Sequence, residues 1–185
     1  MSSLDGTGDA ELLRRMASGA EDAFAEIYRR HQGAIYRFAQ GMSGSAAVAA
    51  EVTQETFLLL IREASRYDPS RGPLPAWLMG VARNHVRKVL EREGRYRPLN
   101  GERPPREEGL EAEMERSERI ALVRQAVLSL PVVYREAVVL CDMEESSYED
   151  AARALGCAVG TVRSRLHRGR EMLAHRLRSH AGSVA

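Results

Sequence analysis

The sequence predicts an all-α protein made of two small helical domains joined by a flexible linker, the second containing a helix-turn-helix. Apolar residues recur at three- and four-residue steps along most of the chain, which is typical of amphipathic helices. No long run alternates between apolar and polar residues, and only 5% of the residues are aromatic, so a sheet is not expected. Between residues 93 and 112 the apolar period stops among prolines and charged residues, which indicates a linker.

The distribution of charge, rather than the formal net charge of +1, points to a nucleic-acid partner. Residues 151–180 contain seven arginines and one acid, a net charge of +6, whereas residues 102–118 contain seven glutamates and three arginines. Charge separated in this way suggests that the two stretches meet different partners. A solvated helix face is the alternative explanation of the basic stretch taken alone.

The composition also limits the classes of protein. A chain of 185 residues, 44% of them hydrophobic, has enough apolar residues for packed cores. Cys141 and Cys157 lie far apart and have no zinc spacing, so we expect a buried reduced thiol at each and no cofactor or metal. No apolar run has membrane-spanning length and no signal peptide is visible, so we expect a cytoplasmic protein without membrane insertion.

The first predicted domain spans residues 9–92. Asp9 is expected to cap its first helix, and a second helix runs from residue 21 to a break at residues 41–45. A third helix, about residues 46–66, carries an apolar stripe made of Val48, Val52, Phe57, Leu60 and Ile61. Beside the stripe lie Glu51, Gln54 and Glu55, which form either an ordinary solvated face or a docking surface.

A loop and a basic helix complete the first domain. Three prolines and a glycine within residues 68–75 predict a non-helical loop of fixed shape. The helix after it carries Trp77, Arg83, Asn84 and Lys88. Trp77 is either a core anchor or a platform on which a base stacks. Cations after a rigid loop are suited to single-stranded nucleic acid, because they follow the phosphates while the loop encloses an unstacked base.

The linker, residues 93–112, and the second domain, residues 113–179, follow. Residues 93–109 of the linker, about seventeen, reach roughly 55–60 Å when fully extended, so the two domains could sit well apart on one large partner. In the second domain Ser147 is expected to cap the first helix of a helix-turn-helix, with Asp150 as a capping-box partner. Gly156 supplies the left-handed residue of the turn.

The second helix of this motif has an inner and an outer face. Its inner residues, at helical spacing, are Val162, Leu166, Gly169 and Leu173. Its outer residues are Thr161, Arg163, Ser164, His167 and Arg168. Arginines pair with guanine edges or phosphates, and hydroxyl groups hold phosphates near a helix start, so this face predicts a DNA reader.

The two halves together resemble an RNA polymerase sigma factor of the small, two-domain extracytoplasmic-function (ECF) group. The resemblance covers about residues 9–92 and 122–177. It is carried in the first half by AFAEIYRRH, EVTQETF and WLMGVARN, and in the second by LPVVYREAVVL and SYEDAARALGCAVGTVRSRLHRGREML. It implies a transcription initiation factor, not an enzyme, whose region 2-like and region 4-like domains direct core polymerase to promoters.

The resemblance also implies partners and roles for residues. The expected partners are core RNA polymerase, through its clamp and flap, promoter DNA and an anti-sigma factor. The polymerase-binding set is Glu51, Gln54, Glu55 and Phe57. The set that melts and reads the −10 element is Asp68, Ser70, Arg71, Trp77, Arg83, Asn84 and Lys88. The outer residues from Thr161 to Arg168 would read the −35 element.

Two positions depart from the family pattern. Lys88 stands where the family often has an acid, which puts the detail of strand contact in doubt. Glu145-Ser146 stands where Gly-Leu is common, which suggests altered packing or a polar partner surface.

Two other functions compete with the sigma-factor interpretation. A helix-turn-helix regulator that is not a polymerase subunit explains the second domain equally well, but not the loop followed by WLMGVARN. An enzyme is disfavoured because the five histidines follow no metal or nucleophile spacing and no phosphate-binding glycine motif occurs.

Overall fold

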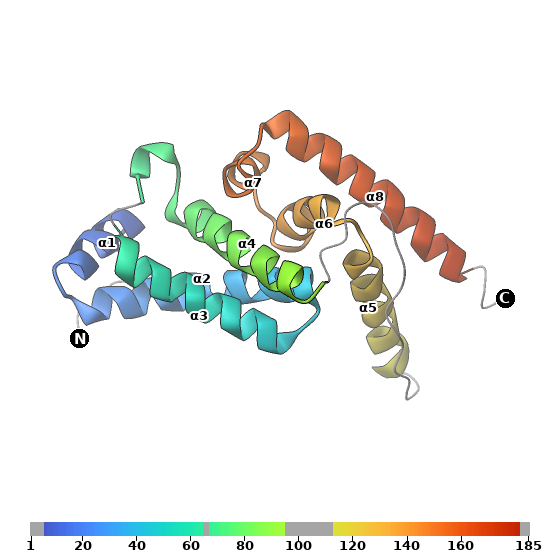
Figure 1. Cartoon of the computed structure of the whole chain (residues 1–185), viewed down its shortest axis with the longest axis horizontal. Helices are drawn as coiled ribbons and strands as arrows, with labels where there is room; N and C mark the ends of the chain where they lie inside the picture. Colours follow the sequence, from blue (N-terminus) through green and yellow to red (C-terminus); the bar gives the residue numbers. More distant parts are fainter. Residues whose placement is uncertain (1–5, 65–66, 95–112, 182–185) are drawn as a thin grey trace.

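The computed structural model describes residues 6–64, 67–94 and 113–181, and within these ranges it is helical with no strand (Figure 1), as predicted. The linker prediction falls largely on residues 95–112, outside the described residues. The first half contains α1 (Asp9–Ala17), α2 (Glu21–Ser43), α3 (Ala46–Glu63), the 3-10 turn η2 (Pro69–Arg71) and α4 (Leu74–Arg92). The second contains α5 (Glu113–Leu128), α6 (Val132–Val138), the π-helical turn η3 (Val139–Met143), α7 (Tyr148–Leu155) and α8 (Val159–Ala181).

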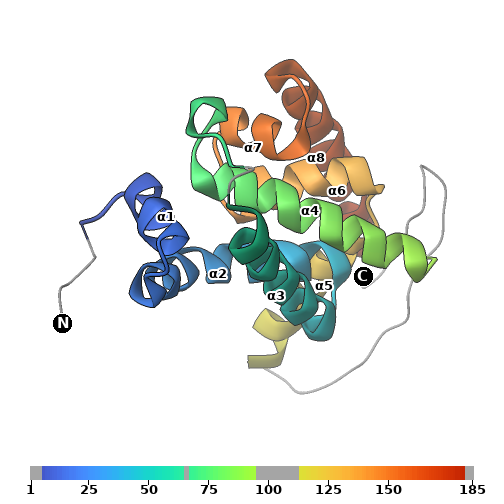
Figure 2. The same cartoon turned by 60° about the vertical axis from the view of Figure 1, so that its left-hand side comes forward.

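The first domain is built on the packing of α2, α3 and α4. Its core contains Phe38, Leu60 and Leu78, each fully buried. Phe24, Tyr28 and Phe57 form an aromatic cluster between α2 and α3, with the rings of Tyr28 and Phe57 4.7 Å apart. Helix α1 packs across α2 at one end of this domain (Figure 2).

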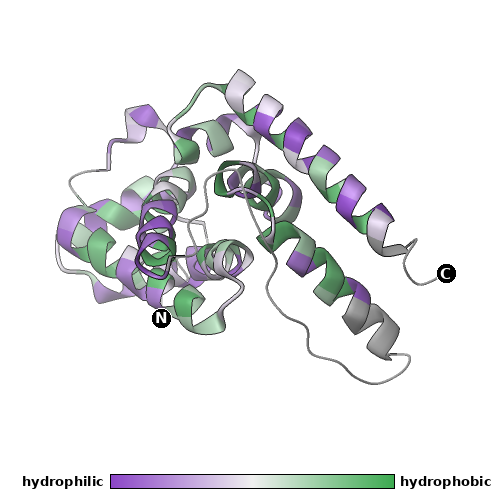
Figure 3. Ribbon diagram, turned by 45° about the vertical axis from the view of Figure 1, so that its right-hand side comes forward, coloured by the Kyte–Doolittle hydropathy of each residue, from purple (hydrophilic) through white to green (hydrophobic). Residues whose placement is uncertain are grey.

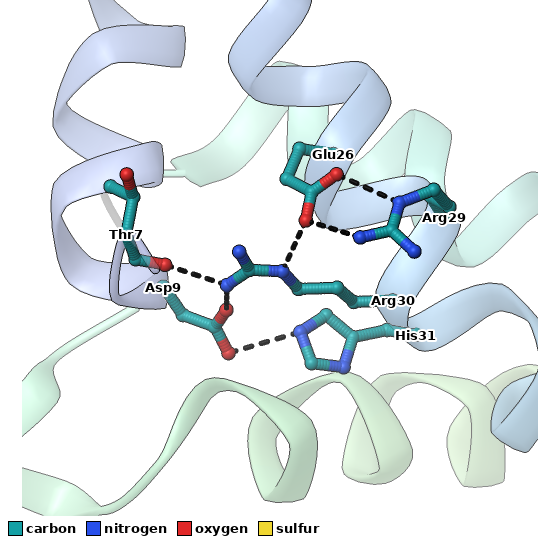
Figure 4. A network of polar contacts seen from close by, with 6 residues as sticks. All are labelled: Thr7, Asp9, Glu26, Arg29, Arg30 and His31. Carbon is teal, nitrogen blue, oxygen red and sulfur yellow. Dashed lines mark hydrogen bonds and ion pairs between the residues drawn. The ribbon is translucent and has the colours of Figure 1, made fainter. Parts of the chain in front are cut away.

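The prediction that Asp9 caps α1 is wrong. Gly8 is the N-cap residue, and Asp9 is the first helical residue. The Asp9 carboxylate instead contacts Arg30 at 3.3 Å and His31 at 3.0 Å on α2 (Figure 4). Arg30 also donates to the carbonyl of Thr7 and to Glu26. The aspartate therefore ties α1 to its neighbour, a tertiary role that competes with capping.

Two further boundaries differ from the sequence prediction. The segment 68–75 is not wholly non-helical, because Pro69–Arg71 forms a 3-10 turn and α4 begins at Leu74. Pro75 lies in the first turn of α4, where the missing N–H has no helical partner to lose. Helix α3 ends at Glu63, short of the predicted residue 66.

In the second domain α8 packs on α6 and α7. Gly169 permits this approach, because a Cβ there would lie 2.7 Å from Cγ2 of Val138 and 3.4 Å from the Tyr134 carbonyl oxygen. The π-helical turn after α6 is joined to α8 by the Arg170–Asp142 ion pair, 2.5 Å long. These contacts fix the direction of α8 relative to the rest of the domain.

The two domains contact each other, although the linker length would have allowed a wide separation. Helix α4 packs against α7, and α2 contacts α5, α6 and η3 (Figures 1 and 2). The helices are close where Gly80 of α4 meets the backbone of Ala154 on α7. Among the described residues, no helix has both the length and the apolar character needed to cross a membrane.

Candidate nucleic-acid interface

A side-chain cap and a left-handed glycine determine the local geometry of the helix-turn-helix. The Ser147 hydroxyl oxygen accepts a hydrogen bond from the Asp150 backbone N–H at 3.1 Å and donates to the Asp150 carboxylate at 2.8 Å. Gly156 has φ +62°, the left-handed conformation that ends α7. The predicted Ser147 cap and the turn are confirmed, whereas Asp150 binds the Ser147 hydroxyl rather than the Ser147 backbone N–H that a capping box uses.

The predicted outer face of α8 is open to solvent. Val162 and Leu166 are 0% and 2% exposed, Gly169 is buried and Leu173 is half-buried, so the inner face packs as predicted. On the outer side Arg163, Ser164, His167 and Arg168 are exposed and Thr161 is half-buried. Hydrophilic residues are prominent along the outer side of α8 (Figure 3).

Weak local interactions hold the charged groups of this face. The Arg163 guanidinium lies 5.5 Å from the centre of the Tyr148 ring. Arg168 and His167 contact the Glu171 carboxylate at 3.3 Å and 3.4 Å, and all three side chains are more than half exposed. Exposed pairs of this kind contribute less than about 1 kcal/mol, so they yield readily to a phosphate.

A rigid turn precedes α4. The Asp68 carboxylate accepts hydrogen bonds from the hydroxyl and backbone N–H of Ser70 at 2.7 Å and 2.9 Å, and these bonds lower the pKa of Asp68. The Tyr67 hydroxyl donates to the carbonyl of Gly72 at 3.0 Å. Trp77 is half-buried with its ring edge-on to Tyr67, so it anchors the turn and leaves part of its surface accessible.

The predicted polar residues of this region are not equally accessible. Ser70, Arg71, Asn84 and Lys88 are exposed, and Asn84 and Lys88 lie one helical turn apart. Arg83 is half-buried and donates from Nε to the Glu136 carboxylate of α6 at 2.8 Å. No local sequence pattern predicts this pair, because it depends on how the two domains meet.

A cleft of about 980 Å³ lies between the turn, α4 and the helix-turn-helix. Arg71, Trp77 and Asn84 line it from the first domain, and Arg153 and Val159 line it from the second. Arg153 packs against Gly72, where a Cβ would lie 2.5 Å from its Cδ. The structure thus brings the start of α8 to the same cleft as Asn84, an arrangement that helical periodicity does not predict.

The predicted polymerase-binding residues fall on and beneath one surface of α3. Glu51 and Gln54 are exposed, Glu55 is half-buried and Phe57 is 3% exposed within the aromatic cluster. The apolar groups on this side of the domain are Tyr28 and Ile61, 41% and 53% exposed. Ile61 was expected in the buried stripe; it lies seven residues after Gln54 and shares its exposed face.

The two cysteines are more accessible than predicted. Both cysteines are half-buried rather than buried, and burial raises the pKa of the Cys141 thiol. Within the described ranges, no group of three or more His, Cys, Asp or Glu residues is placed to hold a metal ion.

Comparison with known families matches both halves of the chain. The family model for Sigma-70 region 2 matches residues 27–96, and that for Sigma-70, region 4 matches residues 120–173. The chain is 37% identical to the ECF RNA polymerase sigma factor SigE of Mycolicibacterium smegmatis, over 98% of this chain and 68% of SigE. It is 34% identical to the RNA polymerase sigma factor CarQ of Myxococcus xanthus, over 87% of this chain and 92% of CarQ.

Two solved structures are similar across both domains. CnrH in complex with the cytosolic domain of CnrY superposes with a TM-score of 0.72 and 25% identity, covering 92% of this chain and 97% of CnrH. The sigma factor RpoE in complex with the anti-sigma factor NepR from Bartonella quintana superposes with a TM-score of 0.64 and 25% identity, covering 84% of this chain and 96% of that chain.

Proposed function

We propose a role for each surface of this chain, which belongs to the ECF RNA polymerase sigma factors. These proteins are non-catalytic polymerase subunits that direct the enzyme to promoters through regions 2 and 4. The region 2 domain, residues 9–92, binds core polymerase and opens the −10 element. The region 4 domain, residues 113–179, reads the −35 element. Residues 93–112 connect the two domains on the polymerase in the cytoplasm.

The outer face of α8 is the proposed −35 reader. Its arginines reach base edges or phosphates in the major groove, and Thr161 and Ser164 contact phosphates near the start of the helix. The exposure of Arg163, Ser164, His167 and Arg168 supports this role, because no packing has to be broken before the helix enters a groove.

The turn and α4 are the proposed −10 reader. The Asp68–Ser70 hydrogen bonds make the turn rigid, so it is preorganised to enclose one unstacked base. Asn84 would hydrogen-bond that base, and Arg71, Arg83 and Lys88 would follow the strand's phosphates. The half-exposed Trp77 ring lies in the same cleft as Asn84, which supports a contact with the displaced strand.

We assign polymerase binding to the exposed surface of α3. Glu51, Gln54 and Glu55 supply its polar contacts with the clamp, while Phe57 supports that surface from beneath. Tyr28 and Ile61 join this set because exposed apolar groups are typical of a docking surface. Region 4 would contact the flap.

An anti-sigma factor is the proposed inhibitory partner. Both similar solved structures are complexes, one with an anti-sigma factor and one with the cytosolic domain of CnrY. Their alignments extend over both halves of this chain, so the likeness that supports such a partner is not confined to one domain.

The observation that carries this proposal is that one chain exposes two sets of polar and basic side chains, one on the outer face of α8 and one on the turn and α4. The test is transcription from supercoiled DNA with core polymerase plus the protein, followed by mapping of the 5′ ends. Arg168→Ala should weaken initiation by roughly tenfold, as the loss of one base or phosphate contact worth 1–3 kcal/mol predicts. Asn84→Ala should reduce strand opening while leaving binding to core unchanged.

Arg14→Ala, which changes an exposed arginine on α1, is the matched control and should behave as wild type. If no complex with core forms and no specific transcript starts, the polymerase-subunit function is wrong for this chain. Duplex binding without core would then favour the helix-turn-helix regulator.

A further inference from the structure

The contact between the two domains has a consistent polarity of charge. Arg83 and Arg87 on α4 approach the Glu136 carboxylate of α6 at 2.8 Å and 3.4 Å. Arg37 on α2 pairs with Glu144, which follows η3, at 2.8 Å. In each pair the first domain supplies the base and the second supplies the acid.

Glu136 is the most deeply buried of these acids. It is 0% exposed, and its Oε2 atom has no hydrogen-bond partner among the described residues. A carboxylate deprived of water in this way is stable only beside cations, and removing one partner of a buried pair is strongly unfavourable. Glu136 returns to water if the domains separate, so its two arginines favour the closed arrangement.

The same two arginines flank the proposed strand-reading residue. Arg83 is adjacent to Asn84, and Arg87 lies one turn further along α4. A guanidinium group makes the same pair of charge-assisted hydrogen bonds to a phosphate as to a carboxylate. Glu136 therefore occupies groups that the phosphates of a single strand would bind.

Close packing of backbones accompanies this pairing. A Cβ on Gly80 of α4 would lie 3.4 Å from the carbonyl oxygen of Ala154 on α7. Gly80 has an ordinary helical conformation and a Cβ there would only touch Ala154, so it is the further carbon atoms of a leucine that would separate the domains without disturbing either helix. A substitution at Gly80 can therefore separate the two domains without changing any charged residue.

We propose that Glu136 is an intramolecular latch, which holds the free chain closed by binding Arg83 and Arg87 until phosphates of the melted promoter strand replace it. The latch rests on the proposed −10 role of α4. It acts within the chain and needs no inhibitory partner. Closing and strand binding exclude each other because they use the same guanidinium groups.

The test uses the full chain without polymerase. Small-angle X-ray scattering gives the radius of gyration, and fluorescence anisotropy gives the affinity for a labelled single-stranded oligonucleotide of 12 nucleotides. Two variants open the contact in different ways. Glu136→Gln removes the charge that holds Arg83 and Arg87, and Gly80→Leu forces α4 and α7 apart. Both should increase the radius of gyration and tighten oligonucleotide binding. If nine-tenths of wild-type molecules are closed, full opening tightens apparent binding about tenfold.

Glu145→Gln is the matched control, because it removes the same charge from an exposed side chain of the same domain and should change neither quantity. Circular dichroism verifies that each variant is folded. A wild-type chain already extended in solution, or no expansion in either variant, would overturn the latch. Expansion without tighter oligonucleotide binding would overturn the competition. Transcription with core is measured separately, so failure of the sigma function would be recognised independently.

Discussion

At the scale of single residues, Glu145 adopts a backbone conformation that side chains rarely take. Its φ is +53°, and the next residue, Ser146, donates its N–H to the carbonyl of Leu140 at 2.9 Å. That bond closes the π-helical turn and joins residues six positions apart, one more than the corresponding bond at the left-handed Gly156, where the Cys157 N–H bonds the Ala152 carbonyl. The fold has therefore kept the turn but placed a glutamate in the glycine position.

Replacing Glu145 by glycine should stabilise the protein. The left-handed conformation costs a side chain about 1–2 kcal/mol, and the greater freedom of glycine in the unfolded chain cancels part of the gain. We expect Glu145→Gly to raise the free energy of unfolding by roughly 0.5–1 kcal/mol, measured by urea denaturation. Glu149→Gly, in an ordinary helical position of α7, should lower it; equal effects at both sites would refute the strain argument.

The network around Glu26 predicts a dependence of stability on pH. Hydrogen bonds from Arg29 and then Arg30 lower the pKa of Glu26 from 4.5 to about 2. Because the pKa is lower in the folded state, the unfolded chain takes up its proton first, and stability is lost as pH falls. The stability difference between wild type and Glu26→Gln should be constant above about pH 5 and shrink between pH 4.5 and 2.

Urea midpoints measured from pH 7 to pH 2 check this dependence. Glu91→Gln, which changes an exposed carboxylate on α4, serves as the control for removing one carboxylate from the surface of the same domain. A difference between wild type and Glu26→Gln that persists unchanged at pH 2 would contradict the assigned hydrogen bonds.

Sequence reasoning at the residue scale succeeded where a signal is local. The Ser147 cap and the left-handed Gly156 depend on neighbours within a few positions, and both are confirmed. Asp9 was misassigned because its partners, Arg30 and His31, lie more than twenty residues away. Glu145 was noted as a departure from the family pattern, but its positive φ could not be read from the residue type.

At the scale of elements, the fit of α8 against α6 depends on one glycine. Replacing Gly169 by alanine would raise the helix propensity of α8. The added Cβ, however, would lie only 2.7 Å from Cγ2 of Val138 and overlap that side chain. Overpacking typically costs 1–3 kcal/mol against a gain of about 1 kcal/mol, so Gly169→Ala should lower the free energy of unfolding. The shift of α8 should also weaken −35-dependent initiation.

Gly160 provides the matched substitution on the same helix. A Cβ there meets nothing within 4 Å, so Gly160→Ala should increase stability by up to about 1 kcal/mol. Thermal unfolding of both variants separates packing from propensity. Stabilisation by both substitutions would show that the approach of α8 to α6 is not tight.

Helical periodicity predicted most elements because an amphipathic helix repeats its pattern over several turns. Periodicity predicted the ends of helices and their buried faces less reliably. The prolines of residues 68–75 suggested a continuous loop, yet Pro69 and Pro75 each occupy the first positions of a helical segment. Ile61 belongs to the predicted apolar stripe, but its position on α3 leaves it half exposed.

At the scale of the whole molecule, the sequence predicted two domains but not their contact. Linker length sets only an upper limit on separation, and the pairing of Arg83 with Glu136 joins residues 53 positions apart. The cleft shared by Asn84 and Val159 follows from that contact. The −35 and −10 elements lie about 25 base pairs, or roughly 85 Å, apart on straight duplex. Helices that line one cleft cannot reach both elements, so promoter binding requires the domains to separate.

A reversible covalent lock between α4 and α7 tests that requirement. A Cβ at Gly80 would lie 3.7 Å from the Cα of Ala154, so the two backbones are near enough for cysteines at these positions to be tested as a cross-link. We expect Gly80→Cys/Ala154→Cys, with Cys141 and Cys157 replaced by serine, to remain compact when oxidised and to initiate no specific transcript with core polymerase. Reduction by dithiothreitol should restore initiation, while Gly80→Cys alone should not respond to the reductant. Initiation by the oxidised, cross-linked protein at the reduced protein's rate would show that the closed arrangement can read a promoter, because the bond prevents the domains from separating.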